Sequence, residues 1–526
     1  MYYVNVAPTL GFKKFGVKGR DIMLSKSKYC AFLECPKKLW LRVNKPELEE
    51  ISDDDRERMK NGNAIGDLAM SYFGDFTEVT TLKDDGRLDL GAMIEKTDAL
   101  IKSGCNVICE ASFSYNGSYC AVDILKKEDD GYSIYEVKSS KVKDKSSEEK
   151  KALEKYSNDI AYQKYVLEKS GIKVVGTYLV RISHDYVFDG ELDIHSFFKV
   201  DDVCDLVEKN VKKVENGINE AIAVLNDSDF DERDCICKEC CDCGFFGHCS
   251  RNMPKPNVFD LFGTGFDKAK KEECYKKGLV TFDDLRGEVK SGSMQEKQIE
   301  HCLNDLDDYI NKDEIKSFLD GLSYPLYFLD FESMNEAIPT VIGTRPYQQI
   351  AFQYSLHYIN SKGGELCHKE FLAESGTDPR LSLAQELCQD IQDGGTVLVY
   401  NKTFEGSILK RLAEDFPQLA ERLNSINGSI KDLYKVFSKG YYYNRAMGSS
   451  LSIKSVLPAL FPNDSELDYH SLDGVHNGAE AMTIFPKIKD MPLDEQLRAR
   501  QALLKYCELD TLAMVKVWQR LTQVCE

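Results

Sequence analysis

Two carboxylates stand two residues apart in the stretch Tyr327 to Glu332, which reads YFLDFE. The apolar and aromatic residues of this stretch predict a buried strand. Side chains at positions i and i+2 of a strand point to the same face, so Asp330 and Glu332 can reach one point in space. Two buried carboxylates are costly unless a cation or another partner compensates them. The pair therefore predicts a site for a divalent metal ion.

Two later segments offer further acidic side chains. Val397 to Leu412 predicts a strand followed by a helix, with Glu405 in the first turn of that helix. Leu503 to Trp518 predicts an amphipathic helix in which Tyr506 and Asp510 lie one turn apart and share a face. A strand and two helices could thus bring their acidic side chains to one metal centre.

The order of these motifs, D-x-E, then N-x-x-x-E, then Y-x-x-x-D, resembles that of the DEDDy exonucleases of the RNase H-like superfamily. The resemblance implies 3'-5' exonuclease activity, with four acidic residues that hold two Mg2+ or Mn2+ ions. These four would be Asp330, Glu332, Glu405 and Asp510. Tyr506 would orient the attacking water. Glu405 departs from the usual aspartate of the second motif, and its extra methylene lengthens the reach to the metal.

Each of these motifs has a simpler interpretation on its own. Glu405 and Asp510 could be solvated helix residues, and Asp330 could merely end a strand. Asp432, in SIKDLYKVF, is a further carboxylate that could approach the metal, although a helix-capping aspartate is the simpler explanation. The order of the three motifs and their predicted elements together favour the metal centre.

An earlier part of the chain carries a second group of candidate residues. Val107 to Val137 predicts a meander of three strands. Asp123 ends the second strand, while Glu136 and Lys138 stand two apart on the third and point the same way. Carboxylates from two neighbouring strands can hold a metal, and a lysine beside them can stabilise a charged phosphate. An E-x-K pair alone is also common on the surface of an edge strand.

The residues around this pair favour a catalytic metal site over a surface pair. A helix is predicted next and carries Gln163, and Glu110 lies one strand upstream. This arrangement resembles the RecB-like nucleases of the PD-(D/E)xK superfamily, which include RecB, AddB and the CRISPR-adaptation nucleases. The resemblance implies that Asp123, Glu136 and Lys138 form the catalytic core, with the two carboxylates as metal ligands. It also implies supporting roles for Gln163 and Glu110.

Two positions depart from the RecB-like pattern. Val122 replaces the proline that gives the superfamily its name, and Gly66 stands where a metal-binding histidine often lies. The missing histidine implies a weaker metal site or a single bound ion.

The chain contains 18 cysteines, several of them clustered. Without a predicted secretion signal, clustered thiols favour metal ligands over disulfides. A C-x2-C-x5-C spacing and a distant cysteine beside a proline resemble the iron-sulfur subset of RecB-like nucleases. The resemblance implies a 4Fe-4S cluster held by Cys35, Cys240, Cys243 and Cys249. The alternative is a zinc site that uses Cys235 or Cys237 with Cys240 and Cys243.

Composition limits the class of protein. A chain of 526 residues should form two or three domains, and 42% hydrophobic with 29% charged residues is typical of a soluble protein. No long apolar run predicts a membrane span, and the N-terminus lacks a secretory pattern, so we expect a cytoplasmic protein without membrane partners. The net charge of -19 argues against nonspecific binding of polyanions. Local lysines from Lys138 to Lys155 and bound metal ions could still support a nuclease.

The order of the motifs predicts an α/β protein with three parts. Residues 1–251 should form a PD-(D/E)xK restriction-endonuclease-like domain, 252–322 a helical spacer and 323–526 an RNase H-like three-layer domain. The spacer faintly resembles helix-hairpin-helix DNA binders, with a plain helical connector as the alternative. Tyr441 to Tyr443 and Arg445 could stack single-stranded bases or belong to a core.

The whole order resembles a family of bacterial and archaeal two-nuclease proteins of poorly defined role. It predicts a metal-dependent nuclease that acts on DNA, single-stranded or at ends, with RNA as an alternative substrate, in repair, recombination or defence. The sequence predicts no particular protein partner. A different hypothesis is a redox-sensitive scaffold that binds nucleic acid while one or both nuclease sites are degenerate. Glu405 and Gly66 are the residues that keep this second hypothesis open.

Overall fold

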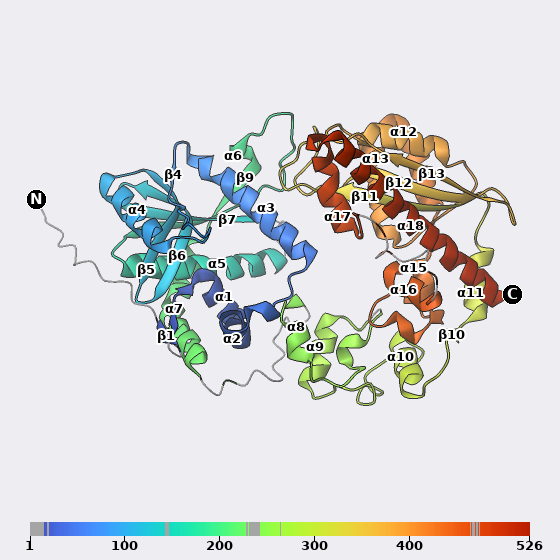
Figure 1. The fold of residues 1–526 in the computed structure, drawn as a ribbon, viewed down its shortest axis with the longest axis horizontal. Coiled ribbons are helices and arrows are strands. Elements are labelled where there is room, and N and C mark those ends of the chain that lie inside the picture. Colours follow the sequence, from blue (N-terminus) through green and yellow to red (C-terminus); the bar gives the residue numbers. More distant parts are fainter. Residues whose placement is uncertain are drawn as a thin grey trace, which may run out of the picture. The chain divides into compact units, whose positions relative to one another are not determined.

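The computed structural model confirms a mixed α/β protein with several sheets (Figure 1). It describes residues 15–17, 20–141, 147–227, 230, 242–263, 265–462, 464, 469, 472 and 474–526. The chain divides into two compact units. The first consists of Met1–Asn252 and Glu336–Tyr347, and the second of Met253–Asn335 and Gln348–Glu526. Among the described helices, none is both long and apolar enough to cross a membrane.

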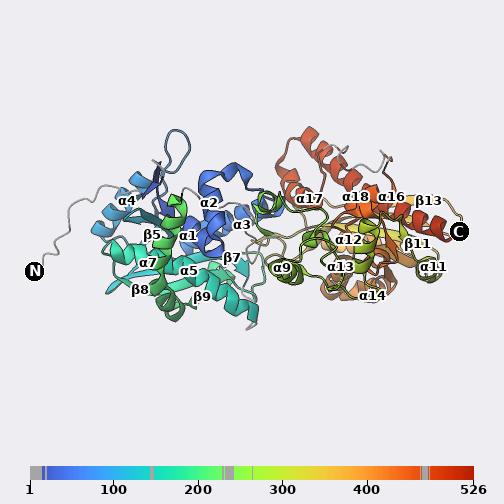
Figure 2. The ribbon, with the colours of Figure 1, turned by 90° about the horizontal axis from the view of Figure 1, so that it is seen from below.

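A seven-stranded sheet forms the centre of the first unit. Its strands, in spatial order, are β4 (Thr77–Glu78), β5 (Val107–Tyr115), β6 (Ser118–Glu128), β7 (Gly131–Lys141), β8 (Val174–Ile182) and β9 (Phe198–Asp202), with β3 (Leu24–Ser25) beside β6. Strands β5, β6 and β7 pair antiparallel in succession, which confirms the predicted meander. Strand β8 runs parallel to β7, and α5 (Ser147–Lys169) connects them. Figures 1 and 2 show α5 lying along the sheet.

Individual capping residues determine where the first helices of this unit begin. The Ser25 hydroxyl accepts a hydrogen bond from the N–H of Lys28 and so starts α1 (Lys26–Glu34). Pro36 then begins α2 (Pro36–Asn44), because proline is tolerated at the first helical position but not inside α1. Cys35 is thereby fixed at the junction. The remaining helices of the unit are α3 (Asp53–Met70), α4 (Leu90–Ser103), α6 (Ile194–Phe197), α7 (Cys204–Asn226) and α8 (Phe246–Ser250).

A segment that is distant in sequence completes the first unit. Residues 336–347 leave the second unit between two of its strands and pack into the core of the first, where Ala337 is 3% exposed. The backbone of Phe188 exchanges hydrogen bonds with this segment, donating to Thr344 and accepting from Gly343. The Tyr347 hydroxyl donates to the carbonyl of Ser139 at 2.8 Å. The chain therefore passes between the units three times, after residues 252, 335 and 347.

The second unit is built on a five-stranded sheet. Its spatial order is β13 (Leu366–Leu372), β12 (Ile350–Ile359), β11 (Leu326–Met334), β14 (Thr396–Val399) and β15 (Ile430–Asp432). Strand β12 is antiparallel to both of its neighbours, while β11, β14 and β15 run parallel. The predicted strand Tyr327 to Glu332 is thus the central strand of the sheet.

Helices cover both faces of this sheet, which lies between α12 and α18 in Figures 1 and 2. On β11, Tyr327, Leu329 and Phe331 pack into the core formed with helices α12, α13 and α14. The alternate residues face the other way, and Phe328 contacts Trp518 of α18. The helices are α12 (Arg380–Asp390), α13 (Lys402–Asp415), α14 (Ala420–Gly428), α16 (Ile453–Leu460), α17 (Gly478–Ile484) and α18 (Leu493–Cys525). The predicted helix at residues 503–518 forms the middle of α18.

The predicted spacer belongs to the second unit. It contains α9 (Lys268–Lys276), α10 (Met294–Leu303), β10 (Tyr309–Ile310) and α11 (Lys312–Asp320). Strand β10 pairs with β16 (Tyr442–Tyr443), whose two tyrosines are almost fully buried. The base-stacking hypothesis is therefore wrong for Tyr442 and Tyr443, because their rings belong to a core.

Candidate metal centres

Strand β11 directs Asp330 and Glu332 toward α18, on the face opposite Tyr327, Leu329 and Phe331. Asp330 is half-buried and Glu332 is buried. Cys507 of α18 joins them, since its Sγ lies 3.7 Å from Oδ2 of Asp330. One potential ligand atom from each of these three residues lies within 4.8 Å of the others. The predicted carboxylate pair thus forms a compact group.

Helix α18 adds a buried carboxylate and a hydroxyl to this group. Asp510 accepts a hydrogen bond of 2.6 Å from the hydroxyl of Tyr469, and its exposed fraction is 9%. The Tyr506 hydroxyl accepts a hydrogen bond of 3.2 Å from Nζ of Lys454. The predicted spacing is confirmed, because Tyr506, Cys507 and Asp510 all lie on the side of α18 that faces β11.

Glu405 reaches the same region from the first turn of α13 and is only 2% exposed. Its Oε2 has no hydrogen-bond partner within the described part of the chain. Burial raises the pKa of Glu405 to about 8, and the charge of Asp432 contributes. Asp432 itself accepts hydrogen bonds from the N–H groups of Asn401 and Tyr434, which supports its interpretation as a capping residue.

The four predicted acidic residues influence one another's protonation. Burial raises the pKa of Asp330 well above its usual range, and three nearby carboxylates raise it further, those of Asp510, Glu332 and Glu405. Burial and the charge of Asp510 also raise the pKa of Glu332. Without a cation, burial and mutual repulsion favour the protonated forms of these carboxyls and so raise the pKa of each of them. A divalent ion could replace those protons, so the donor set fits Mg2+ or Mn2+.

Sequence reasoning missed Cys507, Lys454 and Tyr469. A signal for Cys507 was available, because it stands three residues before Asp510 and therefore shares its helix face. Lys454 and Tyr469 had no such signal. Lys454 approaches the site from α16, and Tyr469 contacts Asp510 across 41 residues of sequence.

The first unit brings its predicted residues together at Glu136 of β7, which is 1% exposed. Lys138 donates to Oε1 of Glu136 at 2.8 Å and to Oδ2 of Asp159 at 2.7 Å. Gln163 of α5 donates from Nε2 to Oε2 of Glu136. Asp123 of β6 accepts the N–H of Val137 at 2.7 Å. The meander and α5 therefore assemble the group that the sequence predicted.

Lys26, the first residue of α1, is a member of this group that the sequence did not predict. Its Nζ donates to both carboxylate oxygens of Glu136, at 2.8 and 3.0 Å, and lies 3.9 Å from Oδ1 of Asp123. Although burial acts in the opposite direction, the charges of Lys138 and Lys26 lower the pKa of Glu136 to about 2. Burial and the charge of Glu136 raise the pKa of Asp123 to about 6.

Glu110 adjoins this group with an unusual backbone. Its φ of 57° is rare for a residue with a side chain and costs on the order of 1 to 3 kcal/mol. Burial raises the pKa of Glu110 to about 7, and the charge of Asp123 contributes. Strain of this size is common at functional sites. At Gly66 of α3, an added Cβ would meet no atom within 4 Å, so close packing at the Cβ position does not require the glycine.

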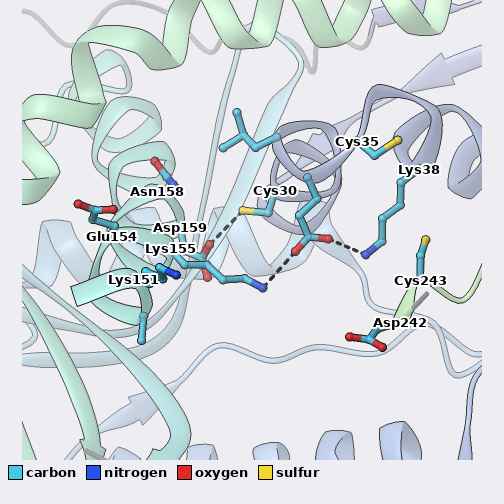
Figure 3. Close-up of a pocket in the computed structure, with 13 residues that line it drawn as sticks. Cys30, Cys35, Lys38, Lys151, Glu154, Lys155, Asn158, Asp159, Asp242 and Cys243 are labelled. Carbon is cyan, nitrogen blue, oxygen red and sulfur yellow. Dashed lines mark hydrogen bonds and ion pairs between the residues drawn. The ribbon is translucent and has the colours of Figure 1, made fainter. Parts of the chain in front are cut away.

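A cavity of about 710 Å³ in the first unit is lined by Asp159, the hydrogen-bond partner of Lys138, and by three cysteines (Figure 3). Both Cys35 and Cys243 line it, and so does Cys30, whose Sγ lies 3.1 Å from Oδ1 of Asp159. The backbone next to Cys243 is fixed by a hydrogen bond from Glu50 to Gly244. Two thiols from distant parts of the sequence thus line one cavity, but among the described residues Cys35, Cys243 and Cys249 do not form a group whose ligand atoms all lie within 4.8 Å of one another. Cys249 lies in α8, whereas Cys235, Cys237 and Cys240 lie outside the described residues.

Comparison with known proteins covers only the middle of the second unit and the inserted segment 336–347 of the first. A family described as a domain of unknown function, DUF2779, matches residues 327–452. The matched segment contains Asp330, Glu332 and Glu405 but ends before Tyr506 and Asp510. Neither curated proteins nor solved structures give a match. The function must therefore be argued from the two sites themselves.

The raised pKa of Glu405 predicts how the metal-free protein responds to pH. Because this pKa is about 8 in the folded chain against 4.5 for a free glutamate, the folded state binds more protons between these values. The free energy of unfolding should then fall as the pH rises from about 4.5 to about 8. Glu405→Gln should remove this contribution, worth up to about 5 kcal/mol. Denaturation in EDTA at pH 5 and at pH 8.5 measures this contribution to the free energy of unfolding. Hydrogen exchange of residues 402–415 then follows the stability of α13 at the same two pH values.

The matched control is Glu414→Gln, an exposed glutamate on the same helix whose side chain is 49% exposed. It should keep the slope of the wild type. Added Mg2+ should flatten the slope of the wild type but not that of Glu405→Gln. A Glu405→Gln protein that lost stability with pH as steeply as the wild type would contradict the buried, unpartnered state of this carboxyl.

Proposed function

We propose that this protein is a metal-dependent nuclease that hydrolyses phosphodiester bonds of DNA, with a 3'-5' exonuclease site in the second unit. The observation that carries the proposal is the crowding of Asp330 by three carboxylates from β11, α13 and α18. Such crowding is costly unless cations compensate it. A group of this kind on the central strand of a sheet therefore favours catalysis by bound ions over a structural role.

The residues around Asp330 suggest how the chain would serve this reaction. When bound, two divalent ions would supply an activated water and neutralise the charge on the leaving oxygen. Asp330, Glu332, Glu405 and Asp510 would hold them. Lys454 donates from its ammonium to the oxygen of Tyr506, while the phenolic proton of Tyr506 is donated to the carboxylate of Asp510.

The topology supports a finer classification of the second unit. Its strand order, with only β12 antiparallel to the other four strands, is compatible with an RNase H-like sheet. We propose that residues 323–526 form a DEDDy exonuclease domain of this type. The meander, α5 and the group around Glu136 support a RecB-like PD-(D/E)xK domain in residues 1–251 in the same way.

The group around Glu136 supports a second, separate cleavage site. Lys138 lies beside Glu136 and could stabilise the charge of a phosphate, while Gln163 holds the orientation of that carboxylate. The cavity that Asp159 lines has a lining of mixed charge, with Lys38, Lys151 and Lys155 beside Glu34, Glu154 and Asp242. Glu34 pairs with both Lys38 and Lys155, so these lysines are balanced within the cavity.

One observation favours a different role for the first unit. The ammonium of Lys26 lies between Glu136 and Asp123, where a divalent ion would otherwise bind. A lysine in this position could replace the ion and leave a site that binds nucleic acid without cutting it. The first unit would then be a scaffold, and only the second unit would be catalytic.

Loss of one carboxylate should silence the exonuclease site. Asp330→Asn should reduce Mg2+-dependent removal of 3' nucleotides by more than about 100-fold, because it removes a ligand that three other carboxylates surround. Trimming of 5'-labelled single-stranded DNA measures the effect, with RNA tested in parallel. Asp390→Asn, which changes a half-buried aspartate bonded to Tyr354 on the opposite face of the sheet, should retain the activity. Unchanged trimming by Asp330→Asn would exclude the proposal.

The two sites should be separable. In an Asp330→Asn background, the remaining cleavage of linear and circular DNA should disappear when Lys138→Met is added, because the phosphate then loses its cationic partner. Lys141→Met is the matched control on the same strand, since the Lys141 ammonium lies over the ring of Tyr347 rather than at Glu136. If Asp330→Asn alone abolishes all cleavage, the first unit is a scaffold.

We propose further that the first unit holds a 4Fe-4S cluster on Cys35, Cys240, Cys243 and Cys249. Anaerobically purified protein should contain about four iron and four sulfide per chain. Cys243→Ser should lose the iron and destabilise the first unit, because ligand bonds formed only in the folded state contribute to folding. Cys30→Ser changes a thiol of the same cavity and should keep the iron. Stoichiometric zinc without iron would decide for the zinc alternative.

A further inference from the structure

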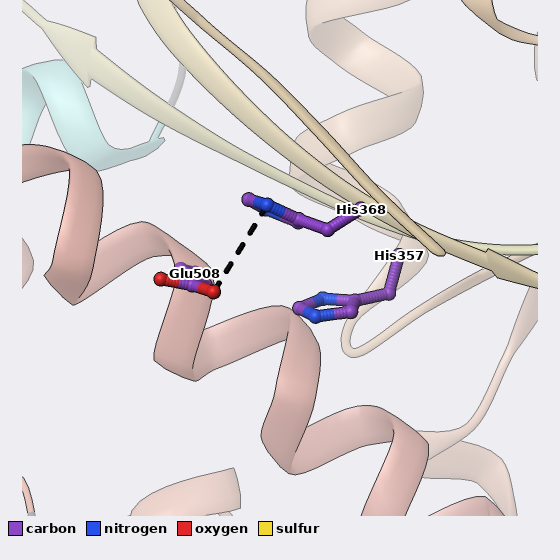
Figure 4. Close-up of side chains that lie close together, drawn as sticks. All are labelled: His357, His368 and Glu508. Carbon is purple, nitrogen blue, oxygen red and sulfur yellow. Dashed lines mark ion pairs between the residues drawn. The ribbon is translucent and has the colours of Figure 1, made fainter. Parts of the chain in front are cut away.

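A second group of metal-ligating side chains lies on the same face of the sheet as Asp330. His357 of β12, His368 of β13 and Glu508 of α18 point toward one another (Figure 4). One potential ligand atom from each lies within 4.8 Å of the others. Nδ1 of His368 is 4.0 Å from Oε1 of Glu508, and the two imidazole rings are 4.5 Å apart at their centres.

Two hydroxyl groups fix the orientation of both imidazoles. Nδ1 of His357 lies 2.8 Å from the hydroxyl of Thr511, and Nε2 of His368 lies 2.9 Å from the hydroxyl of Ser355. These hydroxyls are themselves 2.7 Å apart. Each ring therefore uses one nitrogen for a hydrogen bond and keeps the other available. Histidines that bind metals are held in this way, with the second nitrogen bonded to a polar neighbour.

We propose that His357, His368 and Glu508 bind a divalent transition-metal ion, for which Zn2+ is the best fit. Two imidazoles and one carboxylate form a common zinc set that leaves a fourth position for water. Tetrahedral ligands at about 2.0 to 2.1 Å from zinc lie roughly 3.4 Å apart, so the facing atoms need to approach by about 1 Å. Glu508 can make this movement, because its side chain is 47% exposed.

The present contacts among these residues do not explain the arrangement without an ion. A separation of 4.0 Å between His368 and Glu508 is too long for a hydrogen bond. Within the described part of the chain, no hydrogen bond joins the three facing atoms to one another.

The ligand types separate this site from the acidic centre nearby. Carboxylates suit Mg2+, whereas imidazoles suit Zn2+ and related ions. The proposed ion would also join β12 and β13 to α18, the helix that carries Tyr506 and Asp510. It would act there as a clamp beside the hydrogen bond of 2.8 Å from Gln353 to the carbonyl of Leu503.

Zinc titration of the metal-stripped full chain, with excess Mg2+ to fill the carboxylate centre, tests the proposal. The wild type should bind one more zinc ion per chain than His368→Ala. Zinc held by cysteines is common to both proteins and cancels in this difference. Glu508→Gln changes an exposed side chain, so it should fold normally and bind this zinc at least about tenfold more weakly. His184→Ala, which changes an exposed histidine paired with Asp185, should bind as the wild type does.

A second readout locates the ion. Zinc should slow hydrogen exchange of residues 350–372 and 503–515 in the wild type and in His184→Ala, but not in His368→Ala. Asp330→Asn should retain the zinc, which separates failure of this proposal from failure of the exonuclease proposal. Equal zinc content in the wild type and His368→Ala, or loss of the extra zinc in Asp330→Asn, would overturn the inference.

Discussion

Repulsion between buried carboxylates is the constraint on which the second unit depends. Asp330 lies on the central strand of a sheet and is surrounded by carboxylates from three elements. The same strand contributes Leu329 and Phe331 to the apolar core on its other face. Burial of that face contributes roughly 25 cal/mol for each Å² removed from water and offsets the cost of holding the charges together. Because successive side chains of β11 point to opposite faces, packing of the apolar residues on one face holds the carboxylates together on the other. The carboxylates can therefore bind cations strongly.

The first unit also buries a carboxylate, but it compensates the charge with lysines. Glu136 is even more buried than Glu332, yet its charge is balanced by Lys138 and Lys26 from within the chain. Its pKa is therefore lowered, whereas those of the carboxylates around Asp330 are raised. An internally compensated site gains less from a bound ion than one that holds protons. The dependence on metal concentration should accordingly differ between the two units.

The sequence predicted the elements whose periodicity is regular over several residues. The strand at Tyr327 to Glu332 is a short apolar run, the helix at residues 503–518 is amphipathic and the meander has strong turn signals, so each is recognisable locally. Side chains that arrive from distant segments were not predictable. Lys26 meets Glu136 across 110 residues of sequence, and no local pattern encodes such a contact. The burial of Tyr442 and Tyr443 depends in the same way on pairing with a strand near residue 309.

The path of residues 336–347 has a consequence for any division of the gene. A gene that was split between codons 252 and 253 would yield a first product without this segment, and its core would lose Ala337. The same segment would remain in the second product as an apolar loop between β11 and β12, with no core to bury it. Because of this interleaving, a cut between residues 252 and 253 does not separate the two units cleanly.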